Sequence, residues 1–296
     1  MTLTVSSQVA QAAAVLRTML LDHRAGYRAD EVYERNHDAL WARLETDGWL
    51  TAADPGGALP DLRSVAELAE AWGAALIPLP YIETLLARRV SAEFRDAGPA
   101  SRPATFPLPA AGGGLTWPFG GDGVEPVALG SPTLPETGVR FDQSRLDRFA
   151  PSLPLAHTDG AGSSGSDWAR SWQADALALY AATGVGAAAV ALESSITHAS
   201  QREAFGQAVV KFQAIRHRLA DMYRDLELAR SAACWACQPV ADRVRAAAVS
   251  ADLTRSVLEG AAQVHGGMGF TWELGLHFGT RHILAVRKLI TGVQRG

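Results

Sequence analysis

The sequence has little of several features that would narrow its function at once. Only two cysteines, Cys234 and Cys237, occur among 296 residues, so neither a disulfide framework nor a cysteine-based metal centre is expected. The eight histidines are scattered and form no metal-ligand pattern. The two thiols have a C-W-A-C spacing, but they lie within a helical pattern and not after a strand, which favours two buried packing residues over a redox motif.

An excess of charge of one sign is also lacking. The net charge is −4 and the pI is about 6.1, which gives no electrostatic reason to expect nucleic acid or an anionic membrane as a partner. We find no secretion signal at the N-terminus and no apolar run of roughly 18 or more residues that would span a bilayer. The longest apolar stretch, 177–192, is rich in Ala and Gly and is expected to be a buried helix. A cytoplasmic protein is the expectation.

Helical periodicity dominates both ends of the chain, so the fold is predicted to be mainly α. Helices are expected over 5–21, 38–49, 62–76 and 81–94, and again over 167–200, 207–237, 239–264 and 274–290. The last four, joined by short connections, predict an antiparallel four-helix bundle.

The segment between the two helical regions has a different composition. From about Gly98 to Ser166 it is rich in Gly, Pro, Ser and Thr, with short strands expected near 125–129 and 138–141 and a flexible linker at 160–166. The predicted organisation is a helical domain over 1–97, a reduced β-rich segment over 98–166, and a helical bundle over 167–296.

Two stretches carry candidate chemistry. In the first, S-Q-R-E-A-F-G over 200–206, an arginine precedes an aromatic residue, a glycine and a new helix. A guanidinium at such a corner suits a phosphate or pyrophosphate, although a surface arginine beside a core phenylalanine has the same pattern. In the second, Q-V-H-G-G-M-G-F-T-W-E over 263–273, glycines break a helix and free backbone N–H groups for a close ligand. A plain turn between helices explains it equally well.

The order and intervals of these stretches, together with F-Q at 212–213 and L-A-D-M at 219–222, closely resemble the C-terminal bundle of acyl-CoA dehydrogenases. The resemblance is specific over about 170–290. It is weaker over 30–95, where L-W-x-x-L from 40 and D-G-W from 47 precede an Ala-rich helix that ends in P-L-P at 78–80. The resemblance implies the fold of that family, with α,β-desaturation of an acyl-CoA thioester.

The resemblance also implies FAD at a subunit interface, with its ADP half held by the neighbouring chain. Arg202 would pair with the pyrophosphate, and Phe205, Phe212 and Gln213 would line the adenine side. Gln263, Gly266 and Gly267 would present polar groups to the same moiety. His265, Trp272 and Glu273 are interpreted as packing or structural residues.

The chain departs from the family at the catalytic base. Family members place a glutamate at one of two positions, which correspond here to Ala176 and Ile290, and neither is a carboxylate. Asp175 is one residue away, and one step along a helix turns a side chain by about 100°. The family's T-E-P-x-x-G-S-D stretch is also absent from the middle segment. No catalytic residue is therefore assigned.

This pattern resembles the non-catalytic subunit of heteromeric (α2β2) bacterial acyl-CoA dehydrogenases, several of which act on steroid side chains. The resemblance implies a longer partner subunit that supplies the base, and an electron-transfer flavoprotein as acceptor. Two alternatives remain open: a self-sufficient homo-oligomer that uses Asp175, and a flavin-free binding or regulatory homologue. Flavin content would separate them.

Overall fold

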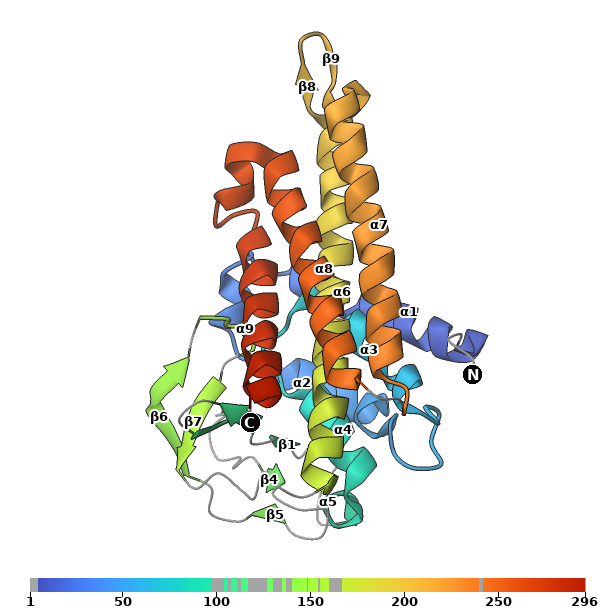
Figure 1. Ribbon diagram of the computed structural model, residues 1–296, viewed down its shortest axis with the longest axis vertical. Coiled ribbons are helices and arrows are strands. Elements are labelled where there is room, and N and C mark those ends of the chain that lie inside the picture. The colour runs from blue at the N-terminus through green and yellow to red at the C-terminus, as the bar shows by residue number, and fades with distance from the viewer. Residues whose placement is uncertain are drawn as a thin grey trace.

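The chain is arranged around one long helix, α6 (Asp167–Gln201), which the other helices surround (Figure 1). In this computed structural model the described residues are 5–96, 149–153, 167–239 and 242–295, together with the backbone of short strands between 104 and 159. The predicted mainly α fold is confirmed. The interpretation of Gly98 to Ser166 as a separate segment, and its linker at 160–166, lie largely outside the described residues.

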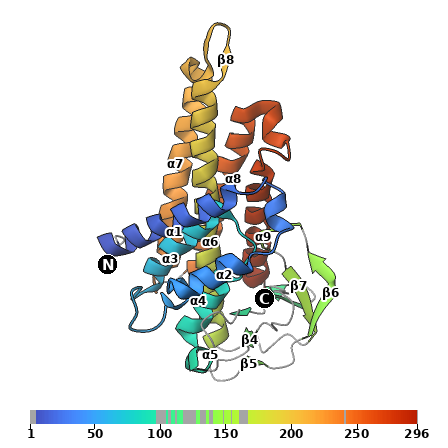
Figure 2. The same ribbon diagram turned by 180° about the vertical axis from the view of Figure 1, so that it is seen from behind.

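The N-terminal helices cover one side of the bundle, as the view from behind shows (Figure 2). They begin at side-chain caps where the sequence offers them: Ser6 accepts a hydrogen bond from the N–H of Val9, and Asp61 accepts one from the N–H of Ser64. These helices are α1 (Ser7–Ala25), η1 (Glu31–Tyr33), α2 (Asp38–Thr46), η2 (Trp49–Thr51), α3 (Leu62–Ala75), α4 (Tyr81–Val90) and α5 (Ala92–Asp96). The single helix predicted over 81–94 is divided at Ser91, whose extended backbone ends α4 and whose hydroxyl accepts from the N–H of Phe94.

Short strands occupy the middle of the chain. A four-stranded antiparallel sheet has the order β2-β3-β7-β6, and a three-stranded sheet has the order β1-β4-β5, in which only β1 and β4 are parallel. The strands are β1 (Ala104–Thr105), β2 (Leu108–Ala110), β3 (Gly113–Thr116), β4 (Val127–Leu129), β5 (Pro135–Glu136), β6 (Arg140–Asp147) and β7 (Leu155–Asp159). The two strands expected from the sequence correspond to β4 and the start of β6.

The C-terminal part forms the predicted antiparallel bundle. It consists of α6, α7 (Gln213–Ala236), α8 (Arg243–His265) and α9 (Leu276–Arg295). The prediction that the second helix begins at Gln207 was wrong: a hairpin of β8 (Glu203–Ala204) and β9 (Gln207–Ala208), followed by η3 (Val209–Lys211), comes first. The hairpin stands at the top of the bundle, beyond the other helices (Figure 1).

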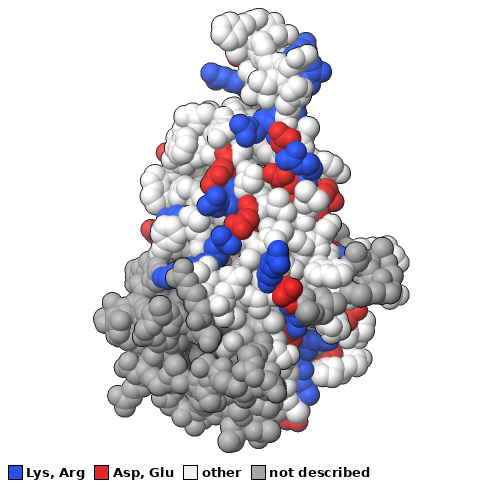
Figure 3. Space-filling model, in the orientation of Figure 1, with Lys and Arg blue, Asp and Glu red and all other residues white. Residues whose placement is uncertain are grey.

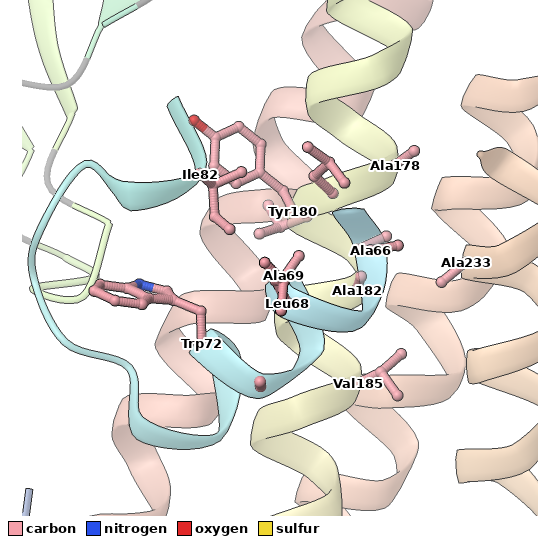
Figure 4. Close-up of a cluster of buried hydrophobic side chains, with 14 of the residues drawn as sticks. Ala66, Leu68, Ala69, Trp72, Ile82, Ala178, Tyr180, Ala182, Val185 and Ala233 are labelled. Atoms are coloured by element: carbon pink, nitrogen blue, oxygen red, sulfur yellow. The ribbon is translucent and has the colours of Figure 1, made fainter. Parts of the chain in front are cut away.

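The helix α6 has the predicted bounds to within one residue, but it is more apolar than the sequence analysis allowed. Its stretch Ser171–Gln201 has the length and hydropathy of a membrane span, but 83% of that apolar window is buried within the structure. The expectation of a buried bundle helix is therefore confirmed for this stretch. Alanines of α6, together with Tyr180 and Val185, form a hydrophobic cluster with α3 that includes Trp72 (Figure 4).

The contact between α3 and α6 requires two glycines. A Cβ atom added to Gly73 would lie 1.9 Å from the backbone oxygen of Thr183, and one added to Gly186 would lie 1.9 Å from the backbone oxygen of Glu70. Because the two backbones approach this closely, the N-terminal helices and the C-terminal bundle share one continuous core. That close packing fixes the height of the hairpin relative to the N-terminal helices.

Candidate functional site

The corner between α6 and α7 presents an arginine and an aromatic ring to solvent. The turn of the hairpin places Phe205 and Gly206 in the left-handed region, with φ of 53° and 79°. This conformation is unfavourable for phenylalanine. The side chain of Phe205 is 96% exposed, and its ring meets that of Phe212 edge-on at 6.2 Å between centroids. Phe212 is half-buried, so the pair forms an aromatic ledge with one open side.

Arg202 directly follows the last residue of α6 and lies beside this ledge. Its N–H donates to the carbonyl of His198, and its carbonyl accepts from the N–H of Val209 at 2.8 Å, so the backbone at the corner is fixed. The side chain is exposed and has no ion-pair partner among the described residues. Gln213, the first residue of α7, is also exposed. The corner therefore offers a free guanidinium, an amide and an aromatic face, a set that suits an anion attached to a flat ring.

The second part of the candidate site lies at the end of α8. Gln263 is exposed, and the N–H of Gly266, which has φ of 60°, donates to the carbonyl of Gln263. No heavy atom lies within 4 Å of a Cβ built on Gly266 or Gly267, so open space surrounds this backbone. The glycines continue into η4 (Gly266–Phe270), where Phe270 is 78% exposed. The structure thus exposes all seven binding residues predicted from the sequence, at least in part.

A histidine pair joins the two parts. The rings of His198 on α6 and His265 on α8 stack at 4.6 Å, and burial lowers the pKa of His198. His265 is buried, with its Nδ1 2.9 Å from the carbonyl of Ala261 and its Nε2 3.3 Å from the hydroxyl of Ser194. Arg202 follows one member of this pair by four residues, and Gly266 follows the other directly. The predicted packing role of His265 agrees with these contacts.

Trp272 and Glu273 were expected to be structural, and the structure places both at the surface. The indole of Trp272 is 57% exposed but meets the ring of His277 edge-on at 4.5 Å and that of Phe278 at 5.7 Å. Met268 and Phe270 are exposed nearby. The end of α8 is therefore an apolar surface beside the open glycine backbone.

The positions that correspond to the family's base are buried and apolar. Ala176 is 2% exposed and Ile290 is fully buried. Asp175 forms a hydrogen-bonded ion pair with Arg243, whose Nε also donates to the carbonyl of Ala236 at 2.7 Å. Burial raises the pKa of Asp175, and Arg243 opposes that shift. Asp175 thus holds the α7–α8 connection and has its carboxylate engaged.

Sequence reasoning missed a buried polar chain through the core. The hydroxyl of Tyr180 donates to Glu83 at 2.5 Å, and both side chains are buried. The backbone carbonyl of the same Tyr180 accepts from the hydroxyl of Thr183, which lies 2.7 Å from Nε2 of His282. The Nδ1 of His282 lies 3.0 Å from the hydroxyl of Ser152. A glutamate in the otherwise apolar first turn of α4, three residues after Pro80, was the available signal.

Two other kinds of reactive site, a thiol nucleophile and a metal centre, find no support in the described residues. Cys234 on α7 and Cys237 just after it are free, buried thiols, and burial raises the pKa of both, that of Cys237 to about 12. Thiols with raised pKa values are poor nucleophiles. Within the described part of the chain, no three His, Cys, Asp or Glu side chains are grouped to hold a metal ion. The exposed residues at the α6–α7 corner and at the end of α8 are thus the candidate functional site.

Comparison with known proteins gives the family of this fold and site. The family model for the acyl-CoA dehydrogenase C-terminal domain matches residues 176–289, which contain both predicted stretches. Acyl-CoA dehydrogenase IpdE2 of Mycobacterium tuberculosis is 29% identical over 266 residues, which are 86% of this chain and 83% of that protein. Residues 176–289 therefore match the C-terminal domain of the acyl-CoA dehydrogenase family, and most of the chain is similar to an acyl-CoA dehydrogenase.

Two solved structures share the fold over nearly the whole chain. The Tcur3481-Tcur3483 steroid ACAD G363A variant has a TM-score of 0.78 and 22% identity, covering 99% of this chain and 97% of that one. The ChsE4-ChsE5 complex from Mycobacterium tuberculosis has a TM-score of 0.72 and 21% identity, covering 100% and 97%. At these identities the likeness concerns the fold.

Proposed function

We propose that this chain is a subunit of an FAD-dependent acyl-CoA dehydrogenase. It binds the ADP half of FAD, and the isoalloxazine ring of the same FAD lies in a longer partner subunit. The observation that carries the proposal is the combination of two features. The residues expected to bind ADP are at least partly exposed at the top of the bundle, and Arg202 has no ion pair among the described residues, whereas both base positions hold buried apolar side chains. A chain that has both features can bind half of the cofactor but cannot supply the catalytic base, which suits a half-site.

The donor set fits the phosphate-bearing half of FAD. Arg202 has a guanidinium free of ion pairs among the described residues, and Gly266 and Gly267 leave backbone that a ligand can approach closely. The exposed ring of Phe205 offers a face for stacking, because the two-residue turn of the hairpin holds it in solvent beside Phe212.

FAD, when bound, supplies the hydride acceptor for α,β-desaturation of the thioester. The residues of this chain bind and orient it: Arg202 neutralises phosphate charge, the aromatic ledge of Phe205 and Phe212 holds the flat adenine side, and Gln263 offers an amide for hydrogen bonding. None of them accepts the α-proton, so we assign the glutamate base to the partner.

The names of the relatives support a partner and a large acyl group. The ChsE4-ChsE5 and Tcur3481-Tcur3483 structures each carry two protein names, and the second is described as a steroid ACAD. We propose an α2β2 assembly that acts on a steroid-derived acyl-CoA in the cytoplasm and passes electrons to an electron-transfer flavoprotein. A site shared between unlike chains has more room for a bulky acyl group than two identical complete sites.

The experiment that tests the split site is the flavin content of the protein purified from its native source with whatever copurifies. We expect about one FAD for every two chains and a second, longer band. One FAD per chain in a homo-oligomer would overturn the split site and direct attention to Asp175. A colourless preparation, with or without a partner, would favour the flavin-free binding or regulatory alternative.

A substitution tests the residue that carries the site. Arg202→Ala is expected to lower FAD occupancy of the purified complex without unfolding it, because the side chain has no ion pair to lose among the described residues. Arg216→Ala is the control, since Arg216 is another exposed arginine without an ion pair in the described structure. Equal occupancy in the two variants would contradict the phosphate role of Arg202.

A further inference from the structure

A second arginine lies where α7 and α8 meet near the top of the bundle. The side chain of Arg218, on the second turn of α7, crosses Gly260 of α8: its Cδ is 3.7 Å from where a Cβ of Gly260 would lie, and Cγ of Met222 is 2.8 Å from that point. Arg218 is nevertheless exposed. Its stem therefore lies on the bare backbone of α8 while its guanidinium extends into solvent.

The register between the helices places Arg218 on the same side of α8 as the predicted site. Lower in the bundle, the hydroxyl of Ser256 donates to Asp225 at 2.8 Å, so this side of α8 faces α7. Gly260 follows Ser256 by four residues and Gln263 follows Gly260 by three, a spacing that keeps all three on one face of a helix. Arg218 thus lies one helical turn below Gln263.

The charge around the α6–α7 corner is unbalanced. Within 202–218, four basic side chains accompany one carboxylate, Glu203, which leaves +3 in a chain whose net charge is −4. Basic side chains flank the top of the molecule, whereas basic and acidic side chains are interspersed lower on the same face (Figure 3). The four basic residues, which have no ion pair in the described parts of the chain, are Arg202, Lys211, Arg216 and Arg218.

Further down the bundle, two arginines near the α7–α8 face are paired with carboxylates. Arg224 pairs with Asp225 at 2.8 Å, and Arg255 pairs with Glu259 at 3.4 Å. Arg218, between those levels and the open glycines, is an exposed cation near this face that has no such partner among the described residues. An arginine that is held by packing but left without a counter-ion is suited to an anion from another molecule.

We propose that Arg218 is a second cationic contact for the ADP half of the neighbouring subunit's FAD, on the α8 side of the site, with Arg202 on the α6 side. This inference rests on the proposed function. The pyrophosphate of FAD carries two negative charges, of which a single guanidinium balances one. Gly260 contributes by leaving room for the arginine stem, which limits the freedom that the side chain loses on binding.

The test uses the whole complex, tagged on this chain so that its partner copurifies. Arg218→Met keeps the stem over Gly260 and removes the charge, and Arg218→Lys retains a charge without the planar fork. Arg216→Met is the matched control, because it lies two residues away and faces a different side of α7. FAD is removed, and its rebinding is titrated by flavin fluorescence at low and high salt.

We expect Arg218→Met to weaken FAD binding by about tenfold to a hundredfold and to reduce the salt dependence of the affinity, as loss of one charged hydrogen bond would do. Arg218→Lys should recover part of the affinity, and Arg216→Met should match the wild type. Equal affinities for the two methionine variants would overturn this inference alone, provided that Arg202→Ala still weakens binding. No effect at either Arg202 or Arg218 would overturn the proposed function as well.

Discussion

At the residue scale, the role of Asp175 distinguishes the two hypotheses of a split site and a self-sufficient enzyme. A general base must reach the substrate proton with a carboxylate that is free to accept it. The carboxylate of Asp175 is instead bound to Arg243, and its pKa is raised by burial against the opposing effect of that guanidinium. The arrangement resembles a structural ion pair that joins α6 to the start of α8.

Asp175→Asn is therefore expected to leave flavin reduction by acyl-CoA within about twofold of the wild-type complex and to lower the free energy of unfolding by about 1–3 kcal/mol. The loss comes from a partly buried arginine that exchanges a carboxylate for a neutral amide. Stopped-flow flavin absorbance measures the first quantity and urea unfolding the second. A loss of reduction of a hundredfold or more in a folded complex would identify Asp175 as the base.

At the element scale, the crossing of α3 and α6 decides how the N-terminal helices are attached. Alanine is normally favoured over glycine in a helix by roughly 0.5–1 kcal/mol. At Gly186 a Cβ would lie 1.9 Å from the backbone oxygen of Glu70, which cannot move without separating the two helices. An added Cβ at Gly186 would force the whole α3–α6 interface apart. The free energy lost in this way exceeds the gain in helix propensity.

Gly186→Ala is expected to lower the melting temperature markedly, by a destabilisation of several kcal/mol of the kind caused by overpacking against backbone. Gly267→Ala is the matched control, because nothing lies within 4 Å of its added Cβ and the melting temperature should stay close to that of the wild type. Differential scanning calorimetry of both variants measures the difference. If both variants melt at the wild-type temperature, α3 and α6 are farther apart than described.

The elements show which parts of this fold a sequence can predict. Helical periodicity located the long helices to within a few residues, because their apolar faces repeat regularly. It failed at Gln207, where turn geometry at Phe205 and Gly206 replaces the first helical turn with a hairpin. The division at Ser91 was missed for a similar reason, since one extended residue inside an apolar pattern leaves the period unchanged.

The candidate site was predictable only through the resemblance. Taken singly, Arg202 and the glycines at 266 and 267 have ordinary surface explanations, and their order along the chain gave them meaning. Arg218 and the pair of Glu83 with Tyr180 could not be found in this way, because their roles depend on which helices touch. Spacing places residues on one face of a helix, but it does not identify the neighbour.

At the scale of the whole molecule, one buried polar chain connects regions that are distant in sequence. Glu83 on α4, Tyr180 and Thr183 on α6, His282 on α9 and Ser152 before β7 are linked by successive hydrogen bonds. Burial raises the pKa of Glu83 to about 7, with the Tyr180 hydroxyl opposing, and burial lowers the pKa of His282 to about 4. Both groups are therefore uncharged in the folded protein over most of the range between these values.

The two shifts act on stability in opposite directions. From pH 4.5 to 7 the folded state retains the proton of Glu83 more strongly than the unfolded state, so stability falls as pH rises. From pH 4 to 6.5 His282 is protonated in the unfolded state but not in the folded state, so stability rises with pH. Each effect is about 1.4 kcal/mol per pH unit. Between pH 4.5 and 6.5 the two effects cancel. In this range Glu83 and His282 together contribute no net pH dependence to the free energy of unfolding of the wild type.

Removing one partner should reveal the other. Relative to the wild type, the free energy of unfolding of Glu83→Gln should increase by about 3 kcal/mol between pH 4.5 and 7, and that of His282→Gln should decrease by about as much between pH 4 and 6.5. Urea unfolding of both variants and the wild type across this range measures the differences, in which all other titrating groups cancel. Tyr180→Phe is the control, since it removes a hydrogen bond but keeps the glutamate, so its pH dependence should not resemble that of Glu83→Gln. A difference for Glu83→Gln that does not vary with pH would mean that Glu83 titrates near its ordinary value and that the polar chain is open to water.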